Sequence, residues 1–365
     1  MLVLLFVSCI ALIMTYYASK DELPFGLEMA FFLVTFIAAI HYNYGTDFKS
    51  YLRLYNEFSL YELNWHALVN KQLYKEPGWF LINYIFKPFG FCSLIVFLSI
   101  IQNLIYYLFV KKYVSKDWWV MGVFIYLFSN SLYLLNMSMM RQGLSVSLFV
   151  LSWILFDSSN KRLMAVSFAL IFLASTIHSS AIILYPCLLI SFMDKRIFPF
   201  YGIAVLFFFA FFFLNPNLIN SFFLNFADIE DIERLLLKYK DSSTNLSYGI
   251  GFVFMMIPFS IMLYSLKKKD IFSEQELKII AIALIAYLII PFRQSIPMIS
   301  RMAYYFTAFS ISAIPIAYKK LPSPYGFLFT TAFVILTLFD YRSFFQSESY
   351  SKGYMHFHSI FEIIF

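Results

Sequence analysis

Residues 197–214 read IFPFYGIAVLFFFAFFFL, a run of eighteen residues without a single charge. An α-helix of about 20 apolar residues crosses the hydrocarbon core of a bilayer, so this run predicts a membrane-spanning helix. Lys195 and Arg196 stand directly before the run and Asn215 directly after it, as polar residues do at the ends of a span. Apolar runs of the same kind recur on both sides of it. The pattern therefore predicts an all-α, polytopic integral membrane protein.

The composition of the whole chain agrees with this class. Of its 365 residues, 61% are hydrophobic, 22% aromatic and only 13% charged, and the mean hydropathy is +0.74. Soluble domains carry about 25% charged residues, so soluble, disordered and fibrous classes are excluded. The net charge is +6, but Lys and Arg occur in ones to threes between apolar runs, which is typical of topology signals and argues against nucleic acid as a partner.

The length criterion places about twelve membrane spans along the chain. Their ranges are 1–18, 25–42, 92–110, 118–136, 141–157, 162–178, 180–193, 197–214, 248–266, 277–292, 299–318 and 324–340. The first is interpreted as a retained span rather than a signal peptide, because no basic segment precedes it. No repeat or low-complexity linker divides the chain, so residues 1–365 are expected to form one membrane domain.

The distribution of basic residues predicts the orientation of these spans. Fourteen Lys and Arg residues in short loops fall on one side of the membrane, and only Arg141, Arg293 and Arg301 fall in short loops on the other. Cytoplasmic loops are enriched in Lys and Arg. We therefore expect the basic side to be cytoplasmic and both termini to lie outside.

Two longer polar segments, 43–91 and 215–247, fall on the predicted outer side. The first contains an apolar run from Trp79 to Phe89 that is too short to span and is interrupted by Pro88, so it predicts a re-entrant or interfacial helix. The second carries apolar residues at helical spacing among four acidic ones, which predicts an amphipathic helix lying on the membrane. Functional residues are expected on this outer side.

Arginines on the outer side are the first candidates for a binding site. Arg141 begins a span in the sequence Met140-Arg141-Gln142-Gly143, where a guanidinium is placed to grip a phosphate through two hydrogen bonds. An arginine that only anchors the helix end is the alternative. Arg293 and Arg301 bracket another short outer connection that contains no carboxylate, which suggests an anionic ligand, with interfacial anchoring again as the alternative.

Three further polar residues are candidates for acid–base chemistry. His178 lies among small and hydroxyl residues at the outer end of a helical hairpin, where it is interpreted as a general base, a phosphate ligand or a satisfied packing residue. Asp47 and Glu76 stand among turn-forming residues, and each is either a catalytic or positioning carboxylate or the start of a helix. No cofactor is expected, because nucleotide motifs are absent from the sequence. No metal site is expected either, because the three cysteines are scattered and no compact carboxylate cluster faces the candidate site; a cation held by Asp47 is the alternative.

Four blocks of sequence carry a resemblance to a known family. They are Gly45-Thr46-Asp47-Phe48-x-x-Tyr51, Glu76-Pro77-Gly78-Trp79-Phe80-Leu81-Ile82-Asn83, Met140-Arg141-Gln142-Gly143-Leu144-Ser145 and His178-Ser179-Ser180-Ala181. In their order and spacing the chain resembles the EpsG-like members of the Wzy polysaccharide polymerases. The later half is matched more loosely, by an outer loop with arginines and by Arg301-x-x-x-Tyr305.

The resemblance implies a multispanning glycosyltransferase of the bacterial cytoplasmic membrane, related in architecture to the GT-C-like membrane glycosyltransferases. Its substrates would be oligosaccharide units linked to undecaprenyl pyrophosphate, joined on the outer face, with a chain-length regulator and a flippase as candidate protein partners. Arg141, Arg293 and Arg301, with Gln142, would then hold the pyrophosphate, while His178, Glu76 or Asp47 would remove the acceptor proton. His178 is the preferred base or phosphate ligand and Glu76 the preferred positioning residue.

Aromatic residues on the outer side offer flat faces on which sugars stack. The candidates for this role are Tyr51, Trp79, Tyr304 and Tyr305. An aromatic belt at the membrane interface predicts many of the same residues.

Three other functions remain open at this point. A glycan ligase would use the same lipid-linked donor. A transporter or flippase of lipid-linked sugars would instead show charges deep within spans or paired broken helices. A membrane acyltransferase would need a histidine and an acid on the cytoplasmic side, where the sequence offers mainly lysine.

Overall fold

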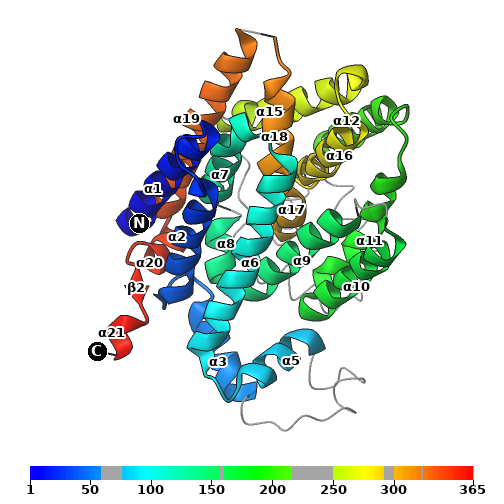
Figure 1. Cartoon of the computed structure of the whole chain (residues 1–365). Coiled ribbons are helices and arrows are strands. Elements are labelled where there is room, and N and C mark those ends of the chain that lie inside the picture. The colour runs from blue at the N-terminus through cyan, green and yellow to red at the C-terminus, as the bar shows by residue number, and fades with distance from the viewer. Residues whose placement is uncertain are drawn as a thin grey trace. The chain divides into compact units, whose positions relative to one another are not determined.

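The computed structural model describes residues 1–58, 76–130, 132–156, 160–215, 250–291, 300–322 and 324–364 (Figure 1). This part of the chain divides into two compact units, which are described one at a time. Unit 1 contains Met1–Leu188 and Thr337–Phe365, and unit 2 contains Leu189–Leu336. The predicted amphipathic helix within 215–247 lies outside the described residues, as does Arg293.

Unit 1 is a helical bundle with one short strand pair. Its elements are α1 (Leu2–Ser19), α2 (Gly26–Ile40), β1 (His41–Tyr42), α3 (Phe48–Phe58), α5 (Pro77–Phe86), α6 (Phe91–Tyr113), a 3₁₀ turn (Lys116–Trp118), α7 (Trp119–Phe128), α8 (Tyr133–Ser138), α9 (Met140–Phe156), α10 (Lys161–Ile177), a 3₁₀ turn (Ser179–Ile183), α11 (Leu184–Cys187), α20 (Glu348–Tyr354), β2 (His358–Ser359) and α21 (Phe361–Ile364).

Unit 2 is helical throughout its described residues. It begins in a 3₁₀ segment (Leu188–Phe192) and continues with α12 (Phe198–Leu214), α15 (Ile250–Lys267), a 3₁₀ turn (Lys269–Ile271), α16 (Glu274–Leu288), α17 (Ser300–Thr307) and α18 (Ser310–Lys319). The long helix α19 (Tyr325–Gln346) starts in unit 2 and ends in unit 1. A capping box starts α16, since the Ser273 hydroxyl accepts from the backbone N–H of Glu276 and the Glu276 carboxylate accepts from that of Ser273.

The helices confirm the all-α class, and the long apolar ones overlap ranges predicted as spans, with α6 and α19 extending beyond theirs. By length and composition alone, α1, α6 and α19 qualify as membrane spans among the described residues, and α2, α9 and α12 are shorter apolar helices. The number of crossings, about twelve, stays a prediction. A short helix, α5, occupies the position expected for the re-entrant or interfacial helix.

Three predicted continuous spans are wrong in detail, because the structure divides each of them. Range 118–136 becomes α7 and α8, and Asn130 between them donates to the Asp340 carboxylate of α19 at 2.9 Å. Range 180–193 becomes 3₁₀ turns around the short α11, where Pro186 has no N–H to donate. Range 299–318 becomes α17 and α18, with Ala308 and Phe309 between them.

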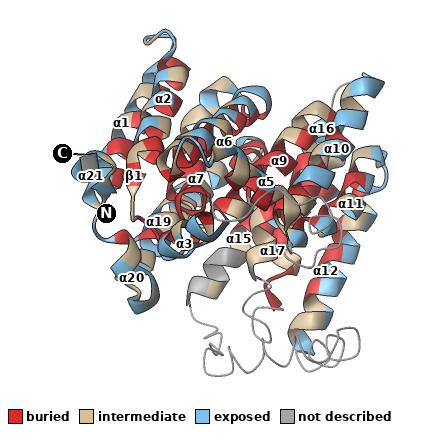
Figure 2. Cartoon of the chain, turned by 90° about the horizontal axis from the view of Figure 1, so that it is seen from below, coloured by how far each residue is buried: buried red, intermediate tan, exposed pale blue. Residues whose placement is uncertain are grey.

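Burial differs between helices of the same apolar character (Figure 2). Most residues of α9 are buried, including the polar Gln142, Ser145 and Ser147. By contrast α12 exposes large apolar side chains, among them Phe200 at 72% and Phe207 at 62%. Exposed apolar surface of this extent is what a lipid-facing helix presents.

The C-terminal tail returns to the first loop of unit 1, which the sequence did not predict. Strands β1 and β2 pair antiparallel, with His41 opposite Ser359, and the N–H of Gly45 donates to the Gly353 carbonyl at 2.8 Å. The N-terminal amine of Met1 donates to the carbonyl of Met355 at 2.7 Å. Met1 and the described end of the tail therefore both lie near the first loop of unit 1.

Candidate functional site

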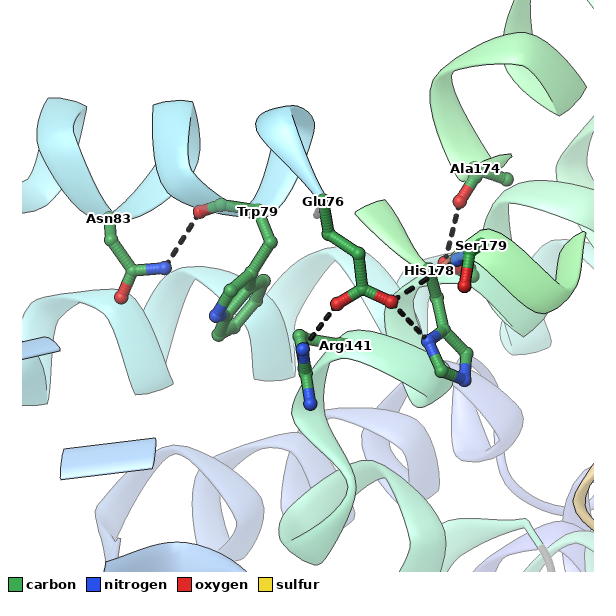
Figure 3. A network of polar contacts seen from close by, with 8 residues as sticks. Glu76, Trp79, Asn83, Arg141, Ala174, His178 and Ser179 are labelled. Carbon is green, nitrogen blue, oxygen red and sulfur yellow. Dashed lines mark hydrogen bonds and ion pairs between the residues drawn. The ribbon is translucent and has the colours of Figure 1, made fainter. Parts of the chain in front are cut away.

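Glu76 stands at the start of α5, and its side chain points away from that helix toward α9 and α10 (Figure 3). Pro77 begins the helix, a position that suits proline because the missing N–H has no helical partner there. The Glu76 side chain is only 10% exposed. A carboxylate this deeply buried requires partners, and two other helices supply them.

Arg141 provides the first partner. It lies in the first turn of α9, and its Nη1 forms an ion pair with Glu76 Oε2. The guanidinium carbon also lies 5.4 Å from the centroid of the Tyr51 ring, a cation–π distance, and Tyr51 packs edge-on against Trp79. One third of the Arg141 side chain, 33%, remains exposed. Its position is therefore fixed on one side while part of it still faces outward.

His178 provides the second partner. It is the first residue after α10, and its backbone N–H donates to the Ala174 carbonyl at 2.9 Å. The imidazole Nδ1 lies 2.8 Å from Glu76 Oε1, and the backbone N–H of Ser179 donates to the same oxygen at 3.2 Å (Figure 3). The structure thus joins Glu76, Arg141 and His178 from three separate sequence blocks, and we refer to these three residues as the triad.

Close helix contacts keep the triad together. Gly78 packs against Thr176 so tightly that a Cβ at Gly78 would collide with the Thr176 hydroxyl and lie 3.0 Å from its carbonyl carbon. The Ser145 hydroxyl of α9 donates to the Ala174 carbonyl of α10 at 3.0 Å. These contacts hold the start of α5 and the start of α9 against the end of α10, next to His178.

We expect Gly78→Ala to lower the stability of the protein, because α5 must move away from α10. Overpacking of this kind typically costs about 1–3 kcal/mol. Thermal unfolding of the purified protein in detergent measures the effect. Gly202→Ala is the matched control, since a Cβ at Gly202 meets its nearest neighbour at an ordinary 3.5 Å. Equal unfolding midpoints for the two variants would contradict the close-packing argument.

The charge state of Glu76 follows from its surroundings. Burial alone would raise the pKa of this carboxyl, but the hydrogen bond from His178 and the positive charge of Arg141 outweigh burial, so its pKa falls below the ordinary 4.5. Glu76 is therefore ionised at neutral pH. An ionised carboxylate only accepts hydrogen bonds, so Nδ1 of His178 must be the donor, which leaves Nε2 as a free acceptor when the imidazole is neutral.

This pKa shift predicts a pH-dependent contribution to stability. A carboxyl whose pKa is lower in the folded state stabilises that state above its unfolded pKa, and the contribution is lost as the pH falls through the folded-state value. Wild type should therefore exceed Glu76→Gln in unfolding midpoint above pH 4.5, with the difference shrinking below it. Unfolding curves of both proteins over this range test the expectation. A difference that does not change with pH would contradict it.

The triad combines a residue that can accept a proton, His178, with a positive charge next to it on Arg141. A histidine whose Nδ1–H is held by a carboxylate presents Nε2 as a general base, and the carboxylate stabilises the imidazolium that forms. The adjacent guanidinium of Arg141 can stabilise negative charge on a bound group. No group of three or more His, Cys, Asp or Glu residues suited to a metal ion occurs among the described residues.

The other candidate residues of unit 1 surround the triad without joining it. The Asp47 carbonyl accepts from Tyr51 N–H at the start of α3, and its carboxylate lies near the Thr46 hydroxyl at 3.5 Å, a helix-start arrangement. Gln142 is buried at 3% exposure. Tyr51 and Trp79 are 7% and 2% exposed, so neither ring lies open at the surface; Tyr51 packs against Arg141, and Trp79 packs against Tyr51.

Three candidates fall in unit 2. Arg301, Tyr304 and Tyr305 all lie in α17, where Arg301 and Tyr304 are partly exposed and Tyr305 is fully buried. The sequence predicted that outer-side arginines would converge, and this stays a prediction for Arg293 and Arg301.

Residues that sequence reasoning missed are Thr176 and Ser145, whose contacts fix the triad. The glycine at 78 was the available signal, since glycine at a helix start permits close approach.

The fold and the site together define a helical membrane protein with a buried carboxylate, a histidine and an arginine at one end of its first unit. The sequence model of the EpsG family matches residues 27–359, which is most of the chain. The chain belongs to the EpsG family, and is thereby a membrane protein of the polysaccharide polymerase-like kind. No curated protein and no solved structure matches it.

Proposed function

We propose that the protein is a Wzy-type polysaccharide polymerase that joins oligosaccharide repeat units carried on undecaprenyl pyrophosphate. The reaction takes place on the outer face of the bacterial cytoplasmic membrane, in a protein of about twelve spans with both termini outside and an architecture of the GT-C-like kind. The observation that supports the proposal is the triad: a histidine held by a carboxylate, next to a guanidinium, in a member of the EpsG family.

The transfer proceeds by displacement at the anomeric carbon of the growing glycan. A hydroxyl at the non-reducing end of the next lipid-linked unit attacks that carbon as its bond to the pyrophosphate oxygen breaks. Nε2 of His178 takes the hydroxyl proton, and Glu76 stabilises the resulting imidazolium. The lipid pyrophosphate leaves with the bonding electron pair, and Arg141 stabilises the charge that develops on it. The bond between the sugar and the pyrophosphate, which breaks in this step, supplies the energy, so no nucleotide is needed.

Arg141 suits this role because it keeps donors beyond its contact with Glu76. A guanidinium carries five N–H donors, and the Glu76 contact occupies Nη1. Its partial exposure allows a bound phosphate to approach from outside the bundle. The Tyr51 ring beneath it limits its motion, so less freedom is lost when phosphate binds.

A surface polysaccharide profile from cells tests the function. A deletion strain is complemented with wild type or with His178→Ala at matched membrane levels, and the glycan is separated on a gel. The proposal predicts a ladder for wild type and a single repeat unit for the deletion and the variant. Loss of all surface glycan in the deletion would favour a ligase or an exporter, and an unchanged ladder would refute the proposal and favour a transporter role.

A further inference from the structure

A chain of buried hydrogen bonds joins three helices of unit 1 and ends next to the first turn of α9. Asn136 Nδ2 of α8 donates to the Tyr126 hydroxyl of α7 at 3.3 Å, and that hydroxyl donates to Asn103 Oδ1 of α6 at 2.8 Å. Asn103 Nδ2 then donates to the Ser99 carbonyl at 2.8 Å. All three side chains are buried, at 5%, 0% and 1% exposure respectively. We call Asn136, Tyr126 and Asn103 the polar chain.

The polar chain ends against the turn of α9 that carries Arg141. A Cβ at Gly143 would lie 3.1 Å from the Asn136 Cα and 2.8 Å from its Oδ1, so α8 and α9 touch at this glycine. Gly143 is two residues beyond Arg141, and its N–H donates to the Met139 carbonyl at 2.8 Å, across the break between the two helices. A shift of Asn136 must therefore shift the first turn of α9.

The local helices cannot fix this turn by themselves. The helix α8 has only six residues, and helices this short are unstable without tertiary contacts. Met139, between α8 and α9, has ψ of 65°, so helical hydrogen bonding does not continue smoothly from one helix into the other. Apolar packing has little directional preference, whereas hydrogen bonds between buried groups set orientation and register.

We propose that the polar chain positions Arg141, so that Asn136, Tyr126 and Asn103 are positioning residues of the triad. Their role in catalysis rests on the proposed function, but their effect on Arg141 does not. Removing the Tyr126 hydroxyl breaks the hydrogen bond that joins Asn136 to α7. The first turn of α9, which carries Arg141, is then held less firmly. The ion pair with Glu76 then opens more often, although the hydrogen bonds of the polar chain described above do not themselves reach a residue of the triad.

Chemical labelling of Arg141 tests this without any enzyme assay. Full-length protein in lipid nanodiscs is treated with phenylglyoxal, which modifies free guanidinium groups, and the rate at Arg141 is measured by peptide mass spectrometry relative to the exposed Arg53. Tyr126→Phe is compared with Tyr133→Phe, because Tyr133 is an equally buried phenol whose hydroxyl donates instead to the Val34 carbonyl of α2 at 2.7 Å. Glu76→Gln serves as the positive control.

We expect Tyr126→Phe to raise the labelling rate of Arg141 about fivefold, the change that matches the net worth of one hydrogen bond, and Tyr133→Phe to leave it unchanged. Equal rates in wild type and Tyr126→Phe, or an equal rise in Tyr133→Phe, would overturn the proposal. If Tyr126→Phe does not fold, Gly143→Ala tests the proposal in its place. This variant displaces the first turn of α9 while improving helix propensity. A labelling rise there supports the proposal and no rise overturns it.

A polymerisation assay on the same variants separates the two claims. If wild type polymerises, Tyr126→Phe should lower the turnover of the protein that retains Arg141. In the Arg141→Lys variant the same change should lower turnover little further, because both changes act through the side chain at position 141. Independent, multiplying losses would contradict positioning through Arg141. Failure of wild type to polymerise would refute the proposed function while the labelling result still decides the role of the polar chain.

Discussion

Replacing His178 with alanine should lower the turnover number for glycan polymerisation by about 10²–10⁴-fold, the usual contribution of a general base. The variant removes Nε2, the proton acceptor, and leaves Glu76 in its ion pair with Arg141. Turnover is measured with purified protein and a lipid-linked repeat unit at saturating concentration. Half-saturation by the donor should change little, because the phosphate contact resides in Arg141.

The tail offers a matched control for this change. His358 also places Nδ1 2.8 Å from a glutamate, Glu362, but on an exposed surface outside the triad. His358→Ala should therefore leave turnover near the wild-type value. The turnover of Glu76→Gln should lie between those of His178→Ala and His358→Ala. Adding Glu76→Gln to His178→Ala should lower turnover little further, since the carboxylate acts through the histidine. Equal activity of His178→Ala and wild type would contradict the assignment of the base.

Replacing Arg141 gives the second large effect. Arg141→Ala should lower turnover by about 10²–10³-fold, as loss of a group that stabilises transition-state charge does. Arg141→Lys keeps the charge but loses the planar fork, so its activity should lie well below wild type and above the alanine variant. The measurement is the rate of lipid pyrophosphate release at several donor concentrations.

Arg53 serves as the control for Arg141. It pairs with Glu57 on the exposed face of α3, where its side chain is 74% exposed, so Arg53→Ala should retain wild-type turnover. A ranking in which Arg141→Lys equals wild type would show that only charge matters at this position. A ranking in which both Arg141 variants equal wild type would remove Arg141 from the reaction.

Much of the fold could be predicted from the sequence because lipid imposes simple rules. Apolar length and the absence of charge located the helices, as with 197–214 and α12. The breaks were harder to locate. At the split between α7 and α8, Asn130 donates to Asp340, a contact between residues 210 positions apart that no local pattern reveals. Pairing of the tail with the first loop is equally nonlocal.

The candidate site was predicted in its members but not in its connections. His178, Glu76 and Arg141 could each be selected because charged or titratable groups beside spans are costly and tend to serve a function. Their mutual contacts depend on how α5, α9 and α10 meet, which is set by Gly78 and Ser145. The sequence suggested Glu76 as a positioning carboxylate without identifying its partner, and in the structure it is paired with Arg141.

The most direct test of the account is polymerisation by the purified protein reconstituted in vesicles with one lipid-linked oligosaccharide and no nucleotide. The account predicts that wild type produces a ladder of glycans and releases lipid pyrophosphate in step with each added unit, while His178→Ala produces neither above background and His358→Ala matches wild type. A ladder of equal rate from His178→Ala would contradict the site, and no glycan bond formation by wild type would contradict the function.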